Sequence, residues 1–304
     1  MSTRLLAVFF AILHAAIGAS APSTAPHLPG PSPAYRIQLD RFILPPNRVA
    51  GLLAKARING GPQLRLLVDS GAQYIVLSRG AAARSGCRGG TDLDLVGAGA
   101  SSAALVKQVM ADRVELGDLT FRDTPLLISD RPMPDGIQGV LPLSLFSGFL
   151  ARLDFPAKEL DLFPYPSEPM NSAEAIPIRC SNRLLFLKGT VNQTHEGYFL
   201  IDTGSAYTAV SRSLARVLHE SELLDARTPL DGGLASIDAP VLNGQVHLQV
   251  ASRVLVTGPV IAVDLSAAGR YHNFEISGLI GYNALRDSIL TVNYRDSVVQ
   301  IAPK

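Results

Sequence analysis

An internal repeat constrains the fold of this chain more than any other feature of its sequence. Residues 54–79 reappear without a gap 133 positions later as residues 187–212. A second stretch, residues 137–141, returns 139 positions later, so the second copy holds six additional residues, as expected for a longer loop. Because self-similarity at a fixed spacing indicates a duplicated unit, we predict two similar lobes, residues 35–165 and 170–304.

Each copy has the sequence pattern of a mainly β lobe. An apolar, β-prone run leads into an acidic turn, and a turn-rich segment precedes the run, as in a hairpin. A short helix follows in each copy, with a serine in position to cap its first turn. The expected strands are 64–68, 106–116, 198–201 and 246–256, the expected helices are 78–85 and 211–219, and Pro164 to Pro169 separates the copies.

The first residues form a separate region. A positive charge precedes residues 5–13, which are apolar but too few to span a bilayer, and small residues follow them. This order predicts a cleaved signal peptide over residues 1–20, so we expect an exported protein, periplasmic or secreted. Residues 21–34 are rich in proline, which predicts a disordered or extended tether, with a short pro-segment as the alternative.

Composition and charge exclude several classes of protein. Lys and Arg total 27 against 26 Asp and Glu, so the net charge is +1 and no basic excess favours nucleic acid or an anionic membrane. Tryptophan is absent and aromatic residues make up 6%, which argues against base stacking. No apolar run after the signal reaches the ~18 residues of a membrane helix. We therefore expect no nucleic-acid partner and, after signal removal, no membrane partner.

Motifs of other catalytic classes are missing from the sequence. The six histidines are scattered without metal-ligand spacing, and no Gly-x-Ser-x-Gly elbow occurs. His219 and Glu220 begin like a zinc-protease helix, but Leu223 and Leu224 stand where the second histidine is needed. We expect neither a metal nor a cofactor.

The chain contains two cysteines, Cys87 and Cys180. In an exported protein they can form one disulfide, which would join the end of the first predicted helix to the start of the second lobe. Two free, buried thiols are the alternative, and the sequence alone leaves both open.

Each copy carries an Asp-Ser/Thr-Gly turn directly after an apolar strand, beginning at Asp69 and at Asp202. A single such turn is usually a surface feature, but two at equivalent places in a duplication indicate a shared role. The Ser or Thr hydroxyl can hydrogen-bond to the partner lobe, and glycine lets the backbone turn sharply. If the lobes pack around a pseudo-twofold axis, the two carboxyl groups face each other, share one proton and can act as general acid and base.

With both turns, a glycine-containing stretch after each, and the apolar-apolar-Gly element ending at Gly281, the chain resembles bacterial retropepsin-like and pepsin-like aspartic proteases from about Val49 to the C-terminus. The resemblance implies a mainly β fold of two similar lobes of the pepsin/retropepsin type, related by pseudo-twofold symmetry, with the active-site cleft between them. It implies that Asp69 and Asp202 are the catalytic pair and that the substrate is a peptide or protein. The supporting residues that it implies are Ser70, Gly71, Ala72, Thr203, Gly204 and Ser205, and the flap candidates are Gly97, Gly99, Gly232 and Gly233.

The function expected from this resemblance is an exported aspartic endopeptidase that works as a monomer, because both halves of the site share one chain. A catalytically inactive peptide-binding or envelope-structural protein with the same fold is the alternative. The two copies also differ: Pro142 stands where the second copy has Gly281, and Ala72 where it has Ser205. Because the Ser205 hydroxyl can hydrogen-bond the carboxyl pair and favour its ionised form, we expect a mildly acidic working range.

Overall fold

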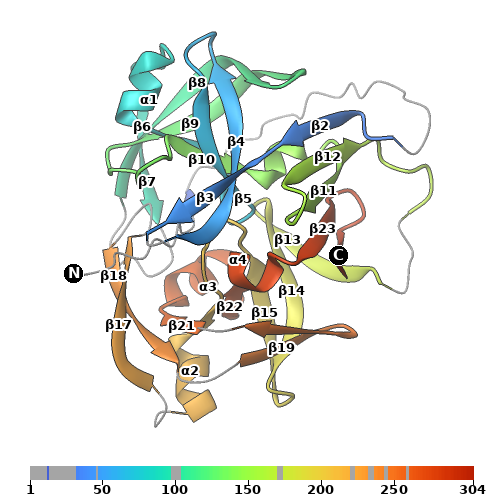
Figure 1. Cartoon of the computed structure of the whole chain (residues 1–304). Coiled ribbons are helices and arrows are strands. Elements are labelled where there is room, and N and C mark those ends of the chain that lie inside the picture. Colours follow the sequence, from blue (N-terminus) through green and yellow to red (C-terminus); the bar gives the residue numbers. More distant parts are fainter. Residues whose placement is uncertain are drawn as a thin grey trace.

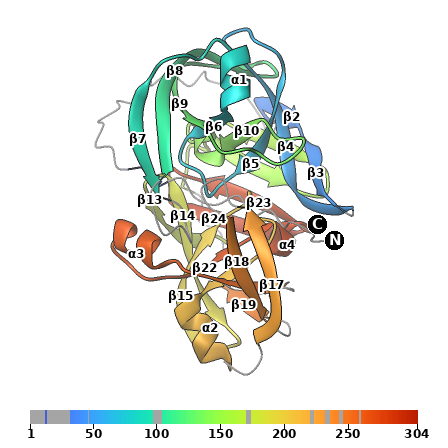
Figure 2. The ribbon, with the colours of Figure 1, turned by 90° about the vertical axis from the view of Figure 1, so that its left-hand side faces the viewer.

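The computed structural model describes residues 12–13, 32–45, 47–96, 104–169, 174–219, 223–231, 236–242, 246–257 and 260–304. Its strands form two lobes, one above the other in Figures 1 and 2, which confirms the mainly β, two-lobed prediction. Most of the predicted signal peptide and tether lies outside the described residues.

The N-terminal lobe is built on a nine-stranded sheet whose strand order is β1-β7-β8-β9-β6-β10-β5-β4-β3. The long strand β8 also pairs with β4, so the sheet folds back on itself. The bounds are β1 Ile12–Leu13, β3 Asp40–Leu44, β4 Arg48–Ile58, β5 Leu64–Asp69, β6 Ile75–Ser78, β7 Thr91–Val96, β8 Ala104–Leu116, β9 Leu119–Ser129 and β10 Gly139–Pro142, with α1 Arg79–Arg84 and the 3-10 helix η1 Leu143–Phe146.

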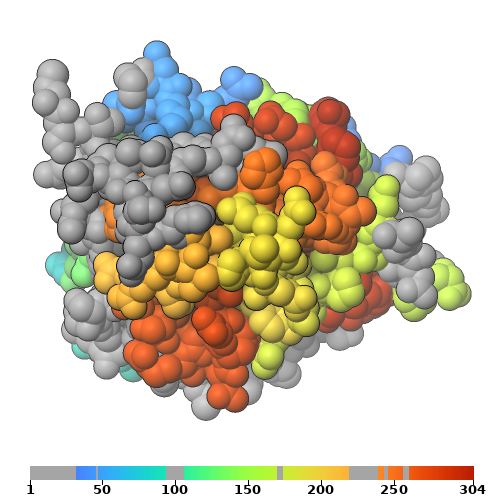
Figure 3. All heavy atoms as spheres, turned by 90° about the horizontal axis from the view of Figure 1, so that it is seen from below, coloured from blue at the N-terminus to red at the C-terminus, as the bar shows by residue number. Residues whose placement is uncertain are grey.

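The C-terminal lobe repeats this plan within a larger sheet. Its strands are β13 Ile176–Ser181, β14 Leu184–Val191, β15 His195–Ile201, β16 Ala209–Ser211, β17 Leu223–Asp231, β18 Ser236–Leu242, β19 Val246–Val250, β20 Arg253–Thr257, β21 Val260–Val263, β22 Ile276–Ile280, β23 Ser288–Asn293 and β24 Val298–Pro303. Its helices are α2 Arg212–His219, α3 Ser266–His272 and α4 Tyr282–Leu285. Figure 3 shows the molecule from below, where residues of this lobe, coloured yellow to red, lie at the centre of the face.

The register of the strands reproduces the internal repeat. β5 runs parallel to β10, and β15 runs parallel to β22. Leu66 faces Gly139 in the first pair, and Phe199 faces Gly278 in the second, which are the same positions at offsets of 133 and 139. β6 and β16 also occupy equivalent places: β6 runs antiparallel to β10, and β16 runs antiparallel to β22. The pairing therefore confirms the duplication, including the change of offset.

The predicted helices and most predicted strands are confirmed, with one correction. Ser78 accepts a hydrogen bond from the backbone of Ala81 at the start of α1, and Ser211 does the same for Leu214 at the start of α2. The single strand predicted over residues 246–256 is wrong, because β19 and β20 form a hairpin there. The chain reverses at Ala251, which has a positive φ of 52°.

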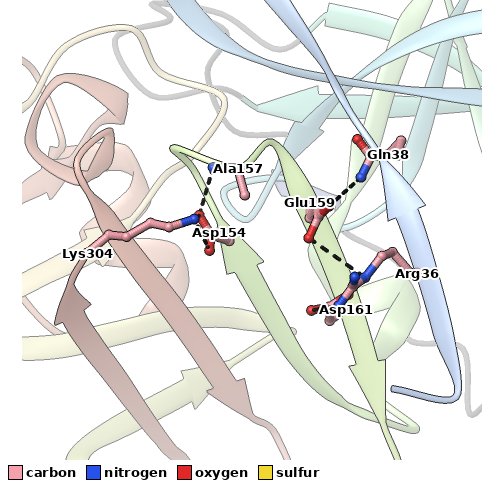
Figure 4. A network of polar contacts seen from close by, with 7 residues as sticks. All are labelled: Arg36, Gln38, Asp154, Ala157, Glu159, Asp161 and Lys304. Carbon is pink, nitrogen blue, oxygen red and sulfur yellow. Dashed lines mark hydrogen bonds and ion pairs between the residues drawn. The ribbon is translucent and has the colours of Figure 1, made fainter. Parts of the chain in front are cut away.

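Six neighbouring strands of the larger, fifteen-stranded sheet join the two lobes, in the order β13-β24-β23-β11-β12-β2. They combine β2 (Tyr35–Gln38), β11 (Leu150–Asp154) and β12 (Glu159–Phe163) with strands of the second copy. Figure 4 shows two of their polar ties. Arg36 binds both carboxylate oxygens of Asp161, at 2.7 and 3.1 Å, and Lys304 binds both of Asp154, at 3.0 and 2.8 Å. This sheet takes strands from both halves of the chain, so it marks no border between the lobes. The lobe boundaries predicted at residues 165 and 170 therefore stay predictions.

The two cysteines are free, so the disulfide alternative is wrong. Cys87 is buried in the core of the N-terminal lobe, where Asn59 Nδ2 approaches its Sγ at 3.7 Å. Cys180 lies on β13 with an exposed side chain, so only one of the two thiols is buried. Among the described residues, no helix is long and apolar enough to cross a membrane.

Candidate active site

Two buried aspartates meet where the lobes join. Asp69 is the last residue of β5, and Asp202 directly follows β15, so each carboxyl group is carried on a rigid strand end. Their exposed fractions are 1% and 0%, and the two carboxyl groups lie close enough for each to shift the pKa of the other. The structure thus brings together the pair that the repeat placed at equivalent positions.

The residues after the aspartates tie the two turns together by reciprocal hydrogen bonds. The backbone N–H of Ser70 donates to Thr203 Oγ1 at 3.0 Å, and the backbone N–H of Thr203 donates to Ser70 Oγ at 3.1 Å. Each hydroxyl then donates to a carbonyl of the opposite strand, Ser70 to Ile201 at 2.7 Å and Thr203 to Val68 at 2.9 Å. All four bonds are buried and related by the pseudo-twofold axis, so they fix the separation of the carboxyl groups.

Each glycine of the two turns faces the aspartate of the other lobe. A Cβ added to Gly204 would lie 2.3 Å from Asp69 Cγ, and one added to Gly71 would lie 2.7 Å from Asp202 Cγ. A real Cβ does not approach another heavy atom so closely, so only glycine allows the carboxyl groups to pack at this distance. Three consecutive residues therefore supply the carboxyl group, the hydroxyl that hydrogen-bonds to the other loop, and the glycine that leaves room for the opposite aspartate.

Backbone N–H groups point at both carboxyl groups. Gly71 donates to Asp69 Oδ1 at 2.7 Å, while Gly204 and Ser205 donate to Asp202 Oδ1 at 3.1 and 3.0 Å. Such donors stabilise the ionised form of a carboxyl group, and they partly offset the cost of burying it.

Burial nevertheless dominates the proton affinity of the pair. Burial raises the pKa of Asp69 to about 6, although the hydrogen bond from Asp202 and backbone N–H groups lower it. The pKa of Asp202 is raised well above its usual range by burial and, further, by the negative charge of Asp69. The pair therefore loses its two protons in two steps, and between these steps the two carboxyl groups share one proton.

Ser205 acts through its backbone rather than through its hydroxyl. The Ser205 hydroxyl donates to the carbonyl of Tyr207 at 2.7 Å, whereas the backbone N–H of Ser205 donates to Asp202. The expected hydrogen bond from this hydroxyl to the carboxyl pair is therefore wrong, because the hydroxyl donates to the Tyr207 carbonyl instead. Ala72, its counterpart, is buried at the same place in the first lobe.

Pro142 fits the first lobe without disturbing the site. Its strand β10 keeps the parallel register with β5, with Pro142 opposite Asp69. In the second lobe the N–H of Gly281 donates to Thr208 Oγ1 at 3.1 Å. The counterpart of Thr208 in the first lobe is Ile75, which offers no acceptor, so the missing N–H of proline leaves no bond unmade.

Sequence reasoning missed residues that support the second turn. Thr208 donates to Asn283 Oδ1 through both its N–H and its hydroxyl, at 2.7 and 2.9 Å. Tyr207 packs under the side chain of Arg48, which comes from the N-terminal lobe. The repeat offset could have identified Thr208 as a difference between copies, because it is polar where Ile75 is apolar.

The proposed flap residues Gly97, Gly99, Gly232 and Gly233 lie outside the described residues. The strands that flank them, β7 with β8 and β17 with β18, pair as antiparallel hairpins. Within the described part of the chain, no three His, Cys, Asp or Glu side chains are grouped so that they could hold a metal ion.

The comparisons with known proteins cover both the first loop and the whole fold. Residues 54–144 match the family model described as aspartyl protease, and this segment contains Asp69 and its turn. The fold is similar to the crystal structure of an aspartic proteinase from Irpex lacteus, with a TM-score of 0.56 and 12% identity over 89% of this chain and 97% of that chain. At this identity the likeness establishes the fold. No curated protein matches the sequence.

Proposed function

We propose that this chain, an aspartic-type peptidase by its family match and its pepsin-like fold, hydrolyses peptide bonds with Asp69 and Asp202 as an acid–base pair. One observation carries the proposal: two buried carboxyl groups lie at the junction of two equivalent turns, close enough for each to shift the pKa of the other. Burying two carboxyl groups side by side costs free energy, and carboxyl groups with strongly raised pKa values cluster at functional sites.

The mechanism follows from the different proton affinities of the two groups. Ionised Asp69 accepts a proton from a water molecule as that water attacks the peptide carbonyl carbon. Protonated Asp202 polarises the carbonyl oxygen and gives it its proton, which yields a neutral tetrahedral diol. The proton taken by Asp69 then passes to the leaving nitrogen, the C–N bond breaks, and Asp202 recovers a proton from the diol. No bond forms between enzyme and substrate.

The proposal includes the setting in which the reaction takes place. An extended peptide would lie across the junction of the lobes and pair with neighbouring backbone in the manner of an added strand. Both aspartates belong to one chain, so a monomer suffices. The N-terminal sequence pattern supports export to the periplasm or the exterior, and the balanced charge supports a protein substrate rather than nucleic acid.

Substitution of each aspartate tests the proposal. Asp69→Asn and Asp202→Asn should each lower kcat/KM for a peptide mixture by at least about 10³-fold, because each removes one half of the acid–base pair. Circular dichroism should show that both variants stay folded, and Asp118→Asn, an exposed carboxyl on the β8–β9 turn, should keep full activity. Cleavage that survives both changes, or a folded wild-type chain that binds peptides without cleaving any, would instead favour the inactive peptide-binding protein.

A further inference from the structure

Arg48 lies against the loop that carries Asp202, although it belongs to the other lobe. It is the first residue of β4, and three residues later a Cβ on Gly51 would lie 3.8 Å from the carbonyl oxygen of Thr203. The Arg48 guanidinium stacks 4.7 Å from the ring centre of Tyr207, and its Nη1 donates to the Tyr207 hydroxyl. The start of β4 therefore lies along the second catalytic loop.

Only a short chain of contacts separates Arg48 from the carboxyl pair. The carbonyl of Tyr207 accepts the hydroxyl of Ser205, and the N–H of Ser205 donates to Asp202 Oδ1. The connection passes along the Tyr207 side chain, so a group held by Arg48 would lie on the side of the aspartate pair that Tyr207 forms.

Two donors of Arg48 are buried and unused. Its Nε and Nη2 are shielded from solvent and have no hydrogen-bond partner. No carboxylate of the described residues forms an ion pair with Arg48. A guanidinium cannot lose its charge in a protein, so burying it without an anionic partner is costly. Burial lowers the pKa of Arg48, which agrees with an uncompensated charge.

The two free nitrogens form the edge of a guanidinium that matches a carboxylate. Nε and Nη2 donate in parallel, which suits the two oxygens of a carboxylate. The same protein shows this arrangement elsewhere: Arg36 uses Nε and Nη2 for the two oxygens of Asp161, at 2.7 and 3.1 Å. At Arg48 the edge has the same shape, and no carboxylate of the described residues forms an ion pair with it.

We propose that Arg48 is a specificity-determining residue that binds a carboxylate of the peptide substrate through Nε and Nη2. The proposal rests on the proposed function, because it names the chemistry of the substrate that the carboxyl pair cleaves. The carboxylate belongs either to an acidic side chain or to the C-terminus of a short peptide. Tyr207 holds the guanidinium through its ring and hydroxyl, so the free edge keeps one orientation.

Matched peptides test the assignment on the intact chain. One set places Glu or Gln in turn at each position of an otherwise neutral peptide with an amidated C-terminus, and a second set compares free and amidated C-termini. Wild type should cleave the peptide with the carboxylate about 10- to 100-fold faster in kcat/KM at one position, as expected for loss of a charge-assisted bond. The set that shows the preference identifies the source of the carboxylate.

Variants of Arg48 separate recognition from support of the loop. Arg48→Gln should remove the preference by slowing only the carboxylate peptides, and Arg48→Lys should restore a small part of it. Arg57→Gln, an exposed change on the same strand, should alter neither peptide. If Arg48→Gln does not fold, the wild-type preference and the Arg48→Lys variant still decide the question. Equal slowing of Glu and Gln peptides, or no preference in wild type, would overturn the proposal.

A binding measurement keeps this inference distinct from the proposed function. Fluorescence anisotropy with labelled Glu and Gln peptides on Asp202→Asn protein should show the same preference without cleavage. Carboxylate-selective binding, together with a folded wild type that cleaves neither set of peptides, would support Arg48 and contradict the peptidase. Cleavage without any carboxylate preference, in kinetics and in binding, would support the peptidase and contradict Arg48.

Discussion

The loops that carry Asp69 and Asp202 have the same geometry but different supports. On the sides that meet, the loops present the same acid, hydroxyl and glycine, with reciprocal hydrogen bonds of nearly equal length. On the sides that pack into their own lobes, the loops differ. The second loop is held by polar contacts of Ser205, Thr208 and Asn283, whereas Ala72 and Ile75 hold the equivalent places of the first loop by apolar packing.

This difference shows which part of the repeat the chemistry constrains. Groups that form hydrogen bonds across the pseudo-twofold axis are the same in both copies, because each bonds to the equivalent residue of the other copy, as Ser70 does to Thr203. Atoms that point back into a lobe have only local partners, so two different local solutions are possible. The predictions below test the matched face first and the divergent supports last.

The glycines of the matched face should give the largest effects. Gly204→Ala and Gly71→Ala should each destabilise the fold by about 3 kcal/mol or more and abolish cleavage, because a Cβ has no room against the opposite aspartate. Gly204→Ala should be the more severe, since its Cβ would lie 2.3 Å from Asp69 Cγ against 2.7 Å for Gly71 and Asp202. Thermal unfolding and peptide cleavage measure both effects.

A control glycine makes this prediction specific. Gly148 has no neighbour within 4 Å of an added Cβ, so Gly148→Ala should change stability and activity little. An active, stable Gly204→Ala variant would mean that the two lobes can separate at this point. That result would contradict the tight approach of the two loops.

The carboxyl pair should make stability and activity depend on pH. The folded-state pKa of Asp69 is raised to about 6, so the folded state binds a proton that the unfolded state releases. The resulting stabilisation is complete below the unfolded pKa of about 4 and is lost as pH rises through about 6, about 3 kcal/mol in total. Activity should rise through the same range as Asp69 ionises and fall at higher pH, where Asp202 loses its proton.

Urea unfolding between pH 4 and 8 and a kcat/KM profile measure these two consequences. Asp202→Asn should flatten the stability curve, because it removes the raised pKa of Asp202 and its coupling to Asp69. Asp118→Asn provides the exposed control. A rate profile that peaks at alkaline pH, or stability curves that are parallel in wild type and Asp202→Asn, would contradict the buried, coupled pair.

Removing one tie between the loops should cost less than removing a glycine. Ser70→Ala takes away the acceptor of the Thr203 N–H and the donor to Ile201, which should destabilise the fold by about 2–3 kcal/mol. Thr203→Val should cost a similar amount, and the double variant less than the sum, because the two bonds support each other. Urea denaturation measures all three, with exposed Thr120→Val as the control, and strictly additive losses would contradict a joint tie.

The sequence predicted the features that are set by neighbouring residues along the chain or by the duplication. The repeat offset placed Asp69 and Asp202 at equivalent points, and local patterns predicted the strands before them and the serine caps of the two helices after them. These features depend on neighbours within a few residues or on the duplication itself.

The features that the sequence did not predict depend on competition in three dimensions. The Ser205 hydroxyl had a carboxyl group and a carbonyl within reach, and only the folded loop shows that the Tyr207 carbonyl takes it. The pairing of β2 with β12 joins residues more than a hundred positions apart. The reversal at Ala251 uses neither glycine nor proline, so it had no turn signal.

The smallest effect should come from exchanging the divergent supports. Thr208→Val should cost about 1–2 kcal/mol, because it leaves the buried N–H of Gly281 without its acceptor. Ile75→Thr should also destabilise the fold, since it buries a hydroxyl to which Pro142, lacking an N–H, cannot donate a hydrogen bond. Adding Pro142→Gly to Ile75→Thr supplies the missing N–H, so a double-mutant cycle should give a favourable coupling of about 1 kcal/mol. Absence of coupling would mean that backbone position, rather than this one hydrogen bond, distinguishes the two lobes.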